Sequence, residues 1–152
     1  MTDKPVPIAP LQYNSKPNKV FIDSNIWTYL FTEDSTRRDT AKQYISQTAE
    51  TGRIVVSYQV INEVCSVLKK KKYTEQEIRQ IVEDIAGLCE VCDFSCDIII
   101  AASRLRERFS LSYWDSLIVS SALAEGCYIL ASEDMQDGLS IDDTTVRNVL
   151  KQ

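Results

Sequence analysis

Three glycines in this chain stand where a helical pattern ends and a strand pattern begins. Gly52 precedes RIVVS, Gly87 precedes LCEVCDF and Gly126 precedes CYILAS. A glycine placed just after a helix commonly adopts the left-handed conformation that ends it. Because residues 19–22, KVFI, also form a strand pattern, strands alternate with helices along the chain. This alternation predicts an α/β protein with a parallel sheet.

The expected elements follow from apolar periodicity and from start and stop signals. Thr74 and Glu77 have the spacing of a capping box at the start of one of the helices. Strands are expected near 19–23, 54–57, 88–93, 127–131 and 145–150, and helices near 24–31, 36–50, 58–70, 75–86, 95–109 and from Trp114 up to Gly126.

The prolines divide the chain into two parts. All four, at positions 5, 7, 10 and 17, fall in the first 17 residues. Residues 1–18 are therefore expected to form an extended or disordered leader. No linker interrupts residues 19–152, and their number is enough to bury one core, so they are expected to form a single domain.

The absence of histidine narrows the chemistry more than any other feature of the composition. It excludes Ser-His-Asp and Cys-His nucleophiles, histidine zinc hydrolases and ribonucleases that use imidazole as acid and base. Any catalysis must use carboxylates, hydroxyls, thiols, lysines or a metal ion. The net charge of −5 argues against a protein coated in positive charge, although a local basic groove is compatible with it.

The chain is expected to be a cytoplasmic protein. It has no apolar run near the roughly 18 residues of a membrane span, and its first ten residues, MTDKPVPIAP, contain no signal-peptide core. Five cysteines, an odd number, fit reduced thiols better than a disulfide framework. Cys89, Cys92 and Cys96 have a spacing that suggests a metal, but no complementary second pair supports a zinc site.

Four acidic residues are expected at one edge of the sheet. Asp23 follows the first strand, and Glu63 lies in the early turns of the helix after the second strand. Asp115 begins the last helix, and Asp134 follows the strand near 127–131. Because ligands of parallel α/β sheets bind outside the carboxyl ends of the strands, these four acids are predicted to converge there.

Asp115 is the least ordinary of the four. Trp114, Leu117, Ile118 and Ala122 recur at helical spacing, and Asp115 falls inside that apolar arc. Its carboxylate is therefore expected to face the core, where a charge is costly unless it is paired or ligated.

Each acid also has a purely structural interpretation. Asp23 can cap a helix, and Glu63 can lie at the margin of an apolar face. Asp115 can interact favourably with the dipole at the start of its helix, and Asp134 can belong to an acidic loop. The four together favour a cation, because clustered carboxylates raise each other's pKa unless a cation neutralises them. Mg²⁺ and Mn²⁺ prefer oxygen ligands, and such an ion activates water and polarises a phosphoryl oxygen. The pattern therefore indicates phosphodiester hydrolysis without histidine.

Two other phosphate-handling classes fit less well. A phosphatase of the haloacid dehalogenase type requires Asp-x-Asp after the first strand, and Asp23-Ser24-Asn25 lacks the second acid. A receiver domain requires an aspartate after a central strand and a lysine after a late one. The residues after Ser57 and Ala131 supply neither.

Three segments resemble the PIN-domain ribonucleases, and the chain is similar in size to the VapC-type toxins of toxin–antitoxin pairs. The segments are VFIDSNIWTYL, SYQVINEVCSVL and LSYWDSLIVSSALAEGCYILASEDMQDG, and the resemblance covers about residues 19–150. It implies a three-layer α/β/α fold with a central, mainly parallel sheet of about four to five strands. The leader of residues 1–18 is longer than that family's usual start.

The resemblance also implies a site and a function. Asp23, Glu63, Asp115 and Asp134 would be the catalytic quartet that binds Mg²⁺ or Mn²⁺, with Asn25 and Ser132 as supporting polar residues. The implied activity is a metal-dependent endoribonuclease with RNA as substrate, a homodimer inhibited by a small antitoxin. The alternative is a non-catalytic PIN-like regulatory or scaffolding module that binds a partner protein or RNA.

Two points stay open at the level of sequence. The choice of Asp134 over Glu133 or Asp137 rests on position alone. Basic residues that could contact phosphates, or could simply be solvated, are Lys69–Lys72 and Arg104, Arg106 and Arg108.

Overall fold

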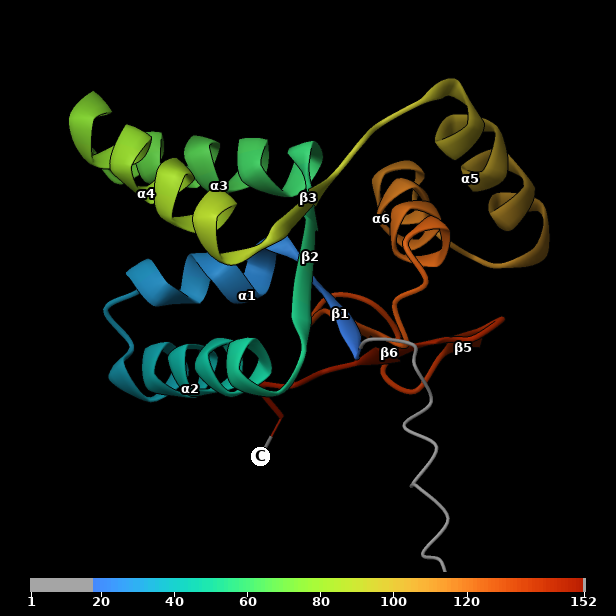
Figure 1. Ribbon diagram of the computed structural model, residues 1–152, viewed down its shortest axis with the longest axis horizontal. Coiled ribbons are helices and arrows are strands. Elements are labelled where there is room, and N and C mark those ends of the chain that lie inside the picture. Colours follow the sequence, from blue (N-terminus) through green and yellow to red (C-terminus); the bar gives the residue numbers. More distant parts are fainter. Residues whose placement is uncertain (1–17, 152) are drawn as a thin grey trace, which may run out of the picture.

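A six-stranded sheet forms the centre of the molecule (Figure 1). The computed structural model describes residues 18–151, so the expected leader lies outside the described residues except for Asn18. The strand order is β3-β2-β1-β4-β6-β5, and all neighbours are parallel except the antiparallel pair β5 and β6. The strands are β1 (Lys19–Ile22), β2 (Arg53–Ser57), β3 (Glu90–Cys92), β4 (Ile129–Ala131), β5 (Ser140–Ile141) and β6 (Thr144–Arg147).

Helices cover both faces of this sheet, with α1 to α4 on one side and α5 and α6 on the other (Figure 1). The chain runs from β1 to β2 to β3 toward one edge and then crosses back to β4, and right-handed crossovers place the helices of these two directions on opposite faces. The three-layer α/β/α prediction is confirmed. The helices are α1 (Ser24–Thr28), a short 3₁₀ turn η1 (Tyr29–Phe31), α2 (Ser35–Thr51), α3 (Tyr58–Lys70), α4 (Glu75–Leu88), α5 (Cys96–Arg108) and α6 (Tyr113–Ala124).

The element boundaries agree closely with the sequence pattern, except at the last edge of the sheet. The capping box forms as predicted, with the Thr74 N–H donating to Glu77 at 2.7 Å and the Glu77 N–H donating to Thr74 Oγ1 at 3.2 Å. The sheet has one strand more than the five that were expected. The additional strand is β5, which was not predicted because two residues are too few to show a strand pattern. Among residues 18–151, no helix is both long and apolar enough to cross a membrane.

The left-handed conformation predicted for three glycines occurs at one of them. Gly126 has a φ of +70°, in the left-handed region expected after a helix. Gly87 instead lies inside α4, and Gly52 has an extended backbone with a φ of −163°. Gly52 is explained by a close approach, because a Cβ there would lie 2.3 Å from the Asn18 carbonyl oxygen.

The expected inward face of α6 is only partly correct. Residues 116–122 are all buried, because α6 lies between the sheet and α5 (Figure 1). A helix covered on two sides has no single apolar face, so its periodicity cannot tell which way a given residue points. Trp114, expected in the core, is 62% exposed, and Asp115 is partly buried in the first turn.

Candidate active site

The candidate site lies where β1 and β4 run side by side at the centre of the sheet. The chain leaves these two strands in opposite directions, and the crevice at their carboxyl ends is the usual ligand position in such sheets. Asp23 directly follows β1, and its N–H donates to the Ala131 carbonyl of β4 at 2.9 Å. Its carboxylate accepts from the Ser24 N–H at 2.7 Å, so Asp23 does cap α1.

Hydrogen bonds connect Asp23 to the loop after β4. The Ser132 hydroxyl donates to Asp23 Oδ2 at 2.9 Å. The Asn25 amide nitrogen lies 3.3 Å from Ser132 Oγ and donates to Asp134 Oδ2 at 3.1 Å. The structure thus brings Asp23, Asn25, Ser132 and Asp134 together, from two segments more than 100 residues apart.

Glu63 joins this cluster from α3, which begins immediately after β2. The Ser24 hydroxyl donates to Glu63 Oε2, and the Gln59 amide donates to Glu63 Oε1 at 3.0 Å. Because Ser24 follows Asp23 in the chain, this contact ties Glu63 to the end of β1. Glu63 is therefore a partly buried member of the cluster rather than a residue at a surface margin.

Asp115 affects the ionisation of Asp23. Burial raises the pKa of Asp23 to about 6, hydrogen bonds from Ser132 and Ser24 oppose that rise, and repulsion from Glu63 and Asp115 adds to it. The carboxylates of Glu63 and Asp115 therefore lie within electrostatic range of Asp23. Asp115 reaches this position at the start of α6, where its N–H donates to Ser112 Oγ at 3.1 Å.

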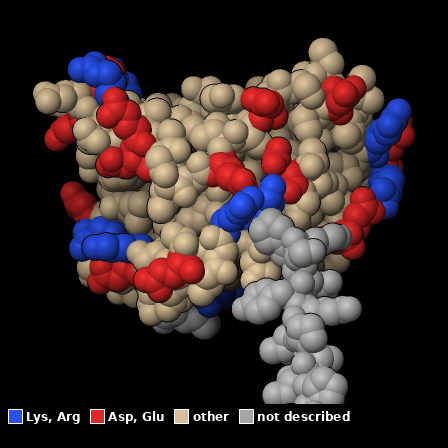
Figure 2. Space-filling view, viewed as in Figure 1, with Lys and Arg blue, Asp and Glu red and all other residues tan. Residues whose placement is uncertain are grey.

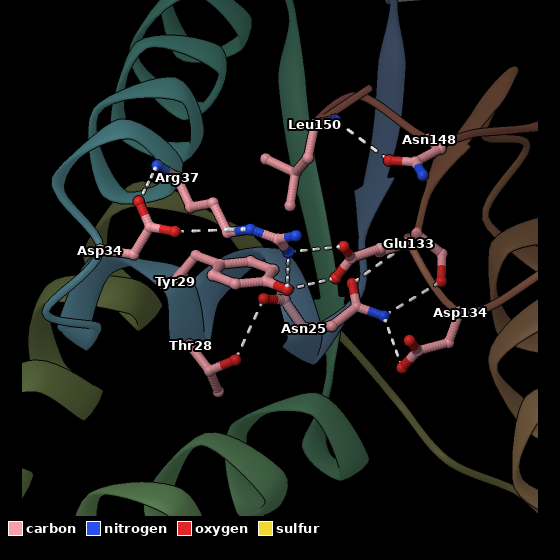
Figure 3. A network of polar contacts seen from close by, with 10 residues as sticks. Asn25, Thr28, Tyr29, Asp34, Arg37, Glu133, Asp134, Asn148 and Leu150 are labelled. Carbon is pink, nitrogen blue, oxygen red and sulfur yellow. Dashed lines mark hydrogen bonds and ion pairs between the residues drawn. The ribbon is translucent and has the colours of Figure 1, made fainter. Parts of the chain in front are cut away.

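Glu133, the neighbour of Asp134, has a different environment (Figure 3). Its carboxylate accepts from Tyr29 Oη at 2.6 Å and from Arg37 Nη1 at 2.9 Å. Arg37 also donates to Tyr29 Oη and lies over the Tyr29 ring. This pairing raises the pKa of Tyr29, with the hydrogen bond to Glu133 as the main cause. Glu133 is thus already paired with a cation of the chain.

Asp137, the third acid after β4, faces another part of the surface. It accepts from the Asn148 N–H at 2.9 Å and pairs with Lys151 at 3.7 Å. The Asn148 hydrogen bond, followed by nearby cations, lowers the pKa of Asp137. Of these three carboxylates, only that of Asp134 is linked to the Asp23 carboxylate, through Asn25 and Ser132.

Four residues around the candidate site were missed in the sequence: Ser24 and Gln59, which bind acids of the cluster, and Tyr29 and Arg37, which bind Glu133. Gln59 lies four residues before Glu63, a spacing at which helical side chains meet, so this contact had a local signal. Ser24 had a weaker signal, as the residue next to a capping aspartate. Tyr29 and Arg37 had none, because their partner Glu133 is 104 and 96 residues away.

The donor set suits a hard divalent cation. Asp23, Glu63, Asp115 and Asp134 offer only oxygen as donor atoms. Burial raises the pKa of Asp23, and repulsion from Glu63 and Asp115 adds to the rise. In residues 18–151, however, no three Asp, Glu or Cys side chains already lie at ligand spacing around one point. Cys89, Cys92 and Cys96 are free thiols and form no such group either.

The basic residues singled out in the sequence are largely engaged within the chain. Lys69 pairs with Glu75, and Arg106 donates to Ser116 Oγ at 2.7 Å. Lys71 lines a groove of about 300 Å³ together with Asn25 and Asp134. On the face shown in Figure 2, basic side chains lie in small groups beside acidic ones and form no continuous basic surface.

Comparison with protein families decides the classification. The model of the PIN domain family matches residues 20–137. The chain belongs to the PIN domain family. The resemblance seen in the sequence is thereby confirmed. Comparison with curated proteins gives no match.

Solved structures support the same fold for this PIN domain. The toxin–antitoxin complex from Klebsiella pneumoniae matches with a TM-score of 0.65 and 24% identity over 83% of this chain and 95% of that chain. VapBC2 from Rickettsia felis, bound to a DNA fragment from its promoter, matches with a TM-score of 0.65 and 19% identity over 85% of this chain and 97% of that chain. VapC20 from Mycobacterium tuberculosis, a sarcin–ricin loop cleaving toxin, matches with a TM-score of 0.60 and 17% identity over 76% of this chain and 89% of that chain.

Proposed function

We propose that this PIN domain is a metal-dependent endoribonuclease that hydrolyses RNA phosphodiesters, and that it is the toxin of a toxin–antitoxin pair. The observation that supports the activity is the buried Asp23 carboxylate. It is repelled by Glu63 and Asp115 and is linked through Ser132 and Asn25 to Asp134. Such an uncompensated group of acids suits a divalent cation and a phosphodiester.

In this proposal Asp23, Glu63, Asp115 and Asp134 hold Mg²⁺ or Mn²⁺. When bound, the ion supplies charge that polarises a phosphoryl oxygen and lowers the pKa of a water molecule. The chain's own residues orient the acids: Ser24 holds Asp23 and Glu63, while Asn25 joins Ser132 to Asp134. With a pKa near 6, Asp23 is mostly ionised at neutral pH and therefore available as a ligand.

The biological role rests on similarity. One similar structure is a sarcin–ricin loop cleaving toxin, another is a toxin–antitoxin complex, and the third is VapBC2 on promoter DNA. We extend these roles to this chain as a proposal: RNA is the substrate, a small antitoxin is the partner, and the protein acts in the cytoplasm as a homodimer.

The test is RNA cleavage by the purified protein with Mg²⁺ or Mn²⁺. We expect products with 5′-phosphate and 3′-hydroxyl ends, and Asp115→Asn should reduce the rate by on the order of 10²-fold or more. Asp137→Asn is the matched control, because Asp137 pairs with Lys151 away from the cluster. Absence of metal-dependent cleavage in the parent protein, or equal rates for both variants, would reject the nuclease. RNA or protein binding without cleavage would then favour a regulatory module.

A further inference from the structure

An apolar groove of about 550 Å³ adjoins the acidic cluster. Three exposed aromatic side chains line it: Tyr58 is 54%, Phe94 46% and Trp114 62% exposed. They come from the start of α3, the loop before α5 and the start of α6. Exposed aromatic groups gathered in one hollow are uncommon on a protein surface and commonly mark a binding site.

The groove is continuous with the candidate active site through Glu63 and Gln59. Glu63 lines the groove and is also hydrogen-bonded to Ser24 beside Asp23. The Gln59 amide donates to Glu63 Oε1 at 3.0 Å and lies 3.5 Å from the Trp114 carbonyl oxygen. A molecule bound in the groove therefore lies beside Glu63, one of the four acids of the cluster.

The lining selects the kind of group that fits. Among the described residues, Glu63 is the one charged side chain that lines the groove, so a phosphate has no cationic partner there. The rings offer stacking surfaces, and the amides of Gln59 and Asn62 offer hydrogen bonds. Unpaired nucleobases are bound in this way, stacked on aromatic side chains with polar groups at their edges.

We propose that this groove binds an unpaired nucleobase of the RNA, stacked on Trp114, next to the phosphodiester that the acids act on. The inference rests on the proposed nuclease function and adds that the substrate is single-stranded at this position. A second copy of the chain is the competing occupant, because aromatic side chains are also frequent in protein interfaces. Continuity with the acids and the amide groups in the lining favour the base.

The experiment uses the full chain and two six-nucleotide single-stranded RNAs, one intact and one with a central abasic nucleotide. Binding is measured in Ca²⁺ and separately in EDTA by tryptophan fluorescence. Trp27 is 2% exposed and Trp114 is 62% exposed, so quenching reports on Trp114. We expect the intact RNA to bind about fivefold or more tightly than the abasic one, as for loss of one stacked base.

Trp114→Leu should remove this difference, and binding by this variant is followed through a dye on the RNA. Tyr128→Leu is the matched control, since Tyr128 is 47% exposed but lines a different groove with Lys19 and Gly126. Circular dichroism checks that both variants fold. Equal binding of the intact and abasic RNAs, or no binding, would overturn the inference. If sedimentation also shows that only Trp114→Leu changes the oligomeric state, a second copy is the occupant.

The two proposals fail in different ways. Cleavage that Asp115→Asn abolishes, combined with equal binding of intact and abasic RNA, would reject base stacking and keep the nuclease. Base-dependent binding without cleavage under any divalent ion would reject the nuclease and keep the base-binding groove.

Discussion

Two groups of acids in this PIN domain differ in what neutralises them. The outer group consists of Glu133 and Asp137, which form ion pairs with Arg37 and Lys151. The acids of the cluster appear in no ion pair of the described residues, and they are Asp23, Glu63, Asp115 and Asp134. Hydroxyl and amide groups donate to the carboxylates of Glu63, Asp134 and Asp23 instead. Glu133 and Asp137 are thus paired within the chain, whereas the four acids of the cluster have no cationic partner among the described residues.

The largest expected effect separates two neighbours in the chain. Asp134→Asn should reduce metal-dependent RNA cleavage by on the order of 10²-fold, because it removes an acid of the cluster. Glu133→Gln should reduce it by less than about tenfold, because the Arg37 pair holds Glu133 outside the cluster. Initial rates at saturating Mn²⁺ provide the comparison. The reverse order would place Glu133, not Asp134, in the site.

Asp23 should lower the stability of the metal-free protein. Its pKa is about 6 in the folded protein against an ordinary value of 3.8. At neutral pH this difference lowers the free energy of unfolding by about 3 kcal/mol. Between about pH 4 and pH 6 the folded protein keeps a proton that the unfolded chain has lost, so stability falls as pH rises through this window. Asp23→Asn should therefore be more stable than the parent by up to about 3 kcal/mol at pH 7.5, with a smaller difference at pH 4.

Urea denaturation in EDTA at the two pH values measures this difference. Thr48→Val, which removes another buried polar side chain far from the acids, serves as a control for general effects of burial. A parent protein as stable as Asp23→Asn at pH 7.5 would show that the Asp23 charge is already compensated in the fold.

A divalent ion should reverse this penalty. If it binds the cluster in the folded state only, Mn²⁺ at about 100 times its Kd adds about 2.7 kcal/mol to the free energy of unfolding. We expect a rise in Tm for the parent protein and for Glu133→Gln, and little or no rise for Asp23→Asn. An equal rise in all three proteins would place the bound ion elsewhere.

The smallest effect concerns the outer group. Tyr29→Phe removes the hydroxyl that bridges Glu133 and Arg37, yet leaves their direct pair intact. This partly exposed contact should cost less than about 1 kcal/mol of stability and change cleavage by less than about threefold. Denaturation and initial rates test both. A large loss of activity would show that Tyr29 also orients the cluster.

The approach of the candidate site residues was predictable from sequence where a general rule converts chain order into position. Asp23 and Asp134 follow strands of a parallel sheet, and such strands end at one edge, so their approach needed no contact information. Glu63 followed from the same rule because α3 begins directly after β2. The wide separation of these residues in the chain did not matter.

Other features could not be foreseen because they depend on three-dimensional packing. The pairing of Glu133 with Arg37 decides which acid is free, and no local pattern marks it. The exposure of Trp114 was mispredicted because α6 is covered on two sides, so its apolar positions do not define one face. Gly52 does end α2 directly before β2, as predicted, but its backbone is extended rather than left-handed, and the lack of a side chain makes room for the Asn18 carbonyl.

Asn25 has a consequence of its own. Its amide nitrogen contacts Ser132 and Asp134, and its oxygen accepts from the Glu133 N–H at 3.3 Å, so one neutral side chain holds three successive residues of the loop. An aspartate there would have nearly the same shape but no N–H to donate, and it would repel Asp134. The arrangement of the acids therefore depends on a neutral side chain that differs from aspartate only in having an amide group in place of the carboxylate. An additional acid at this position would break the contacts that hold the loop.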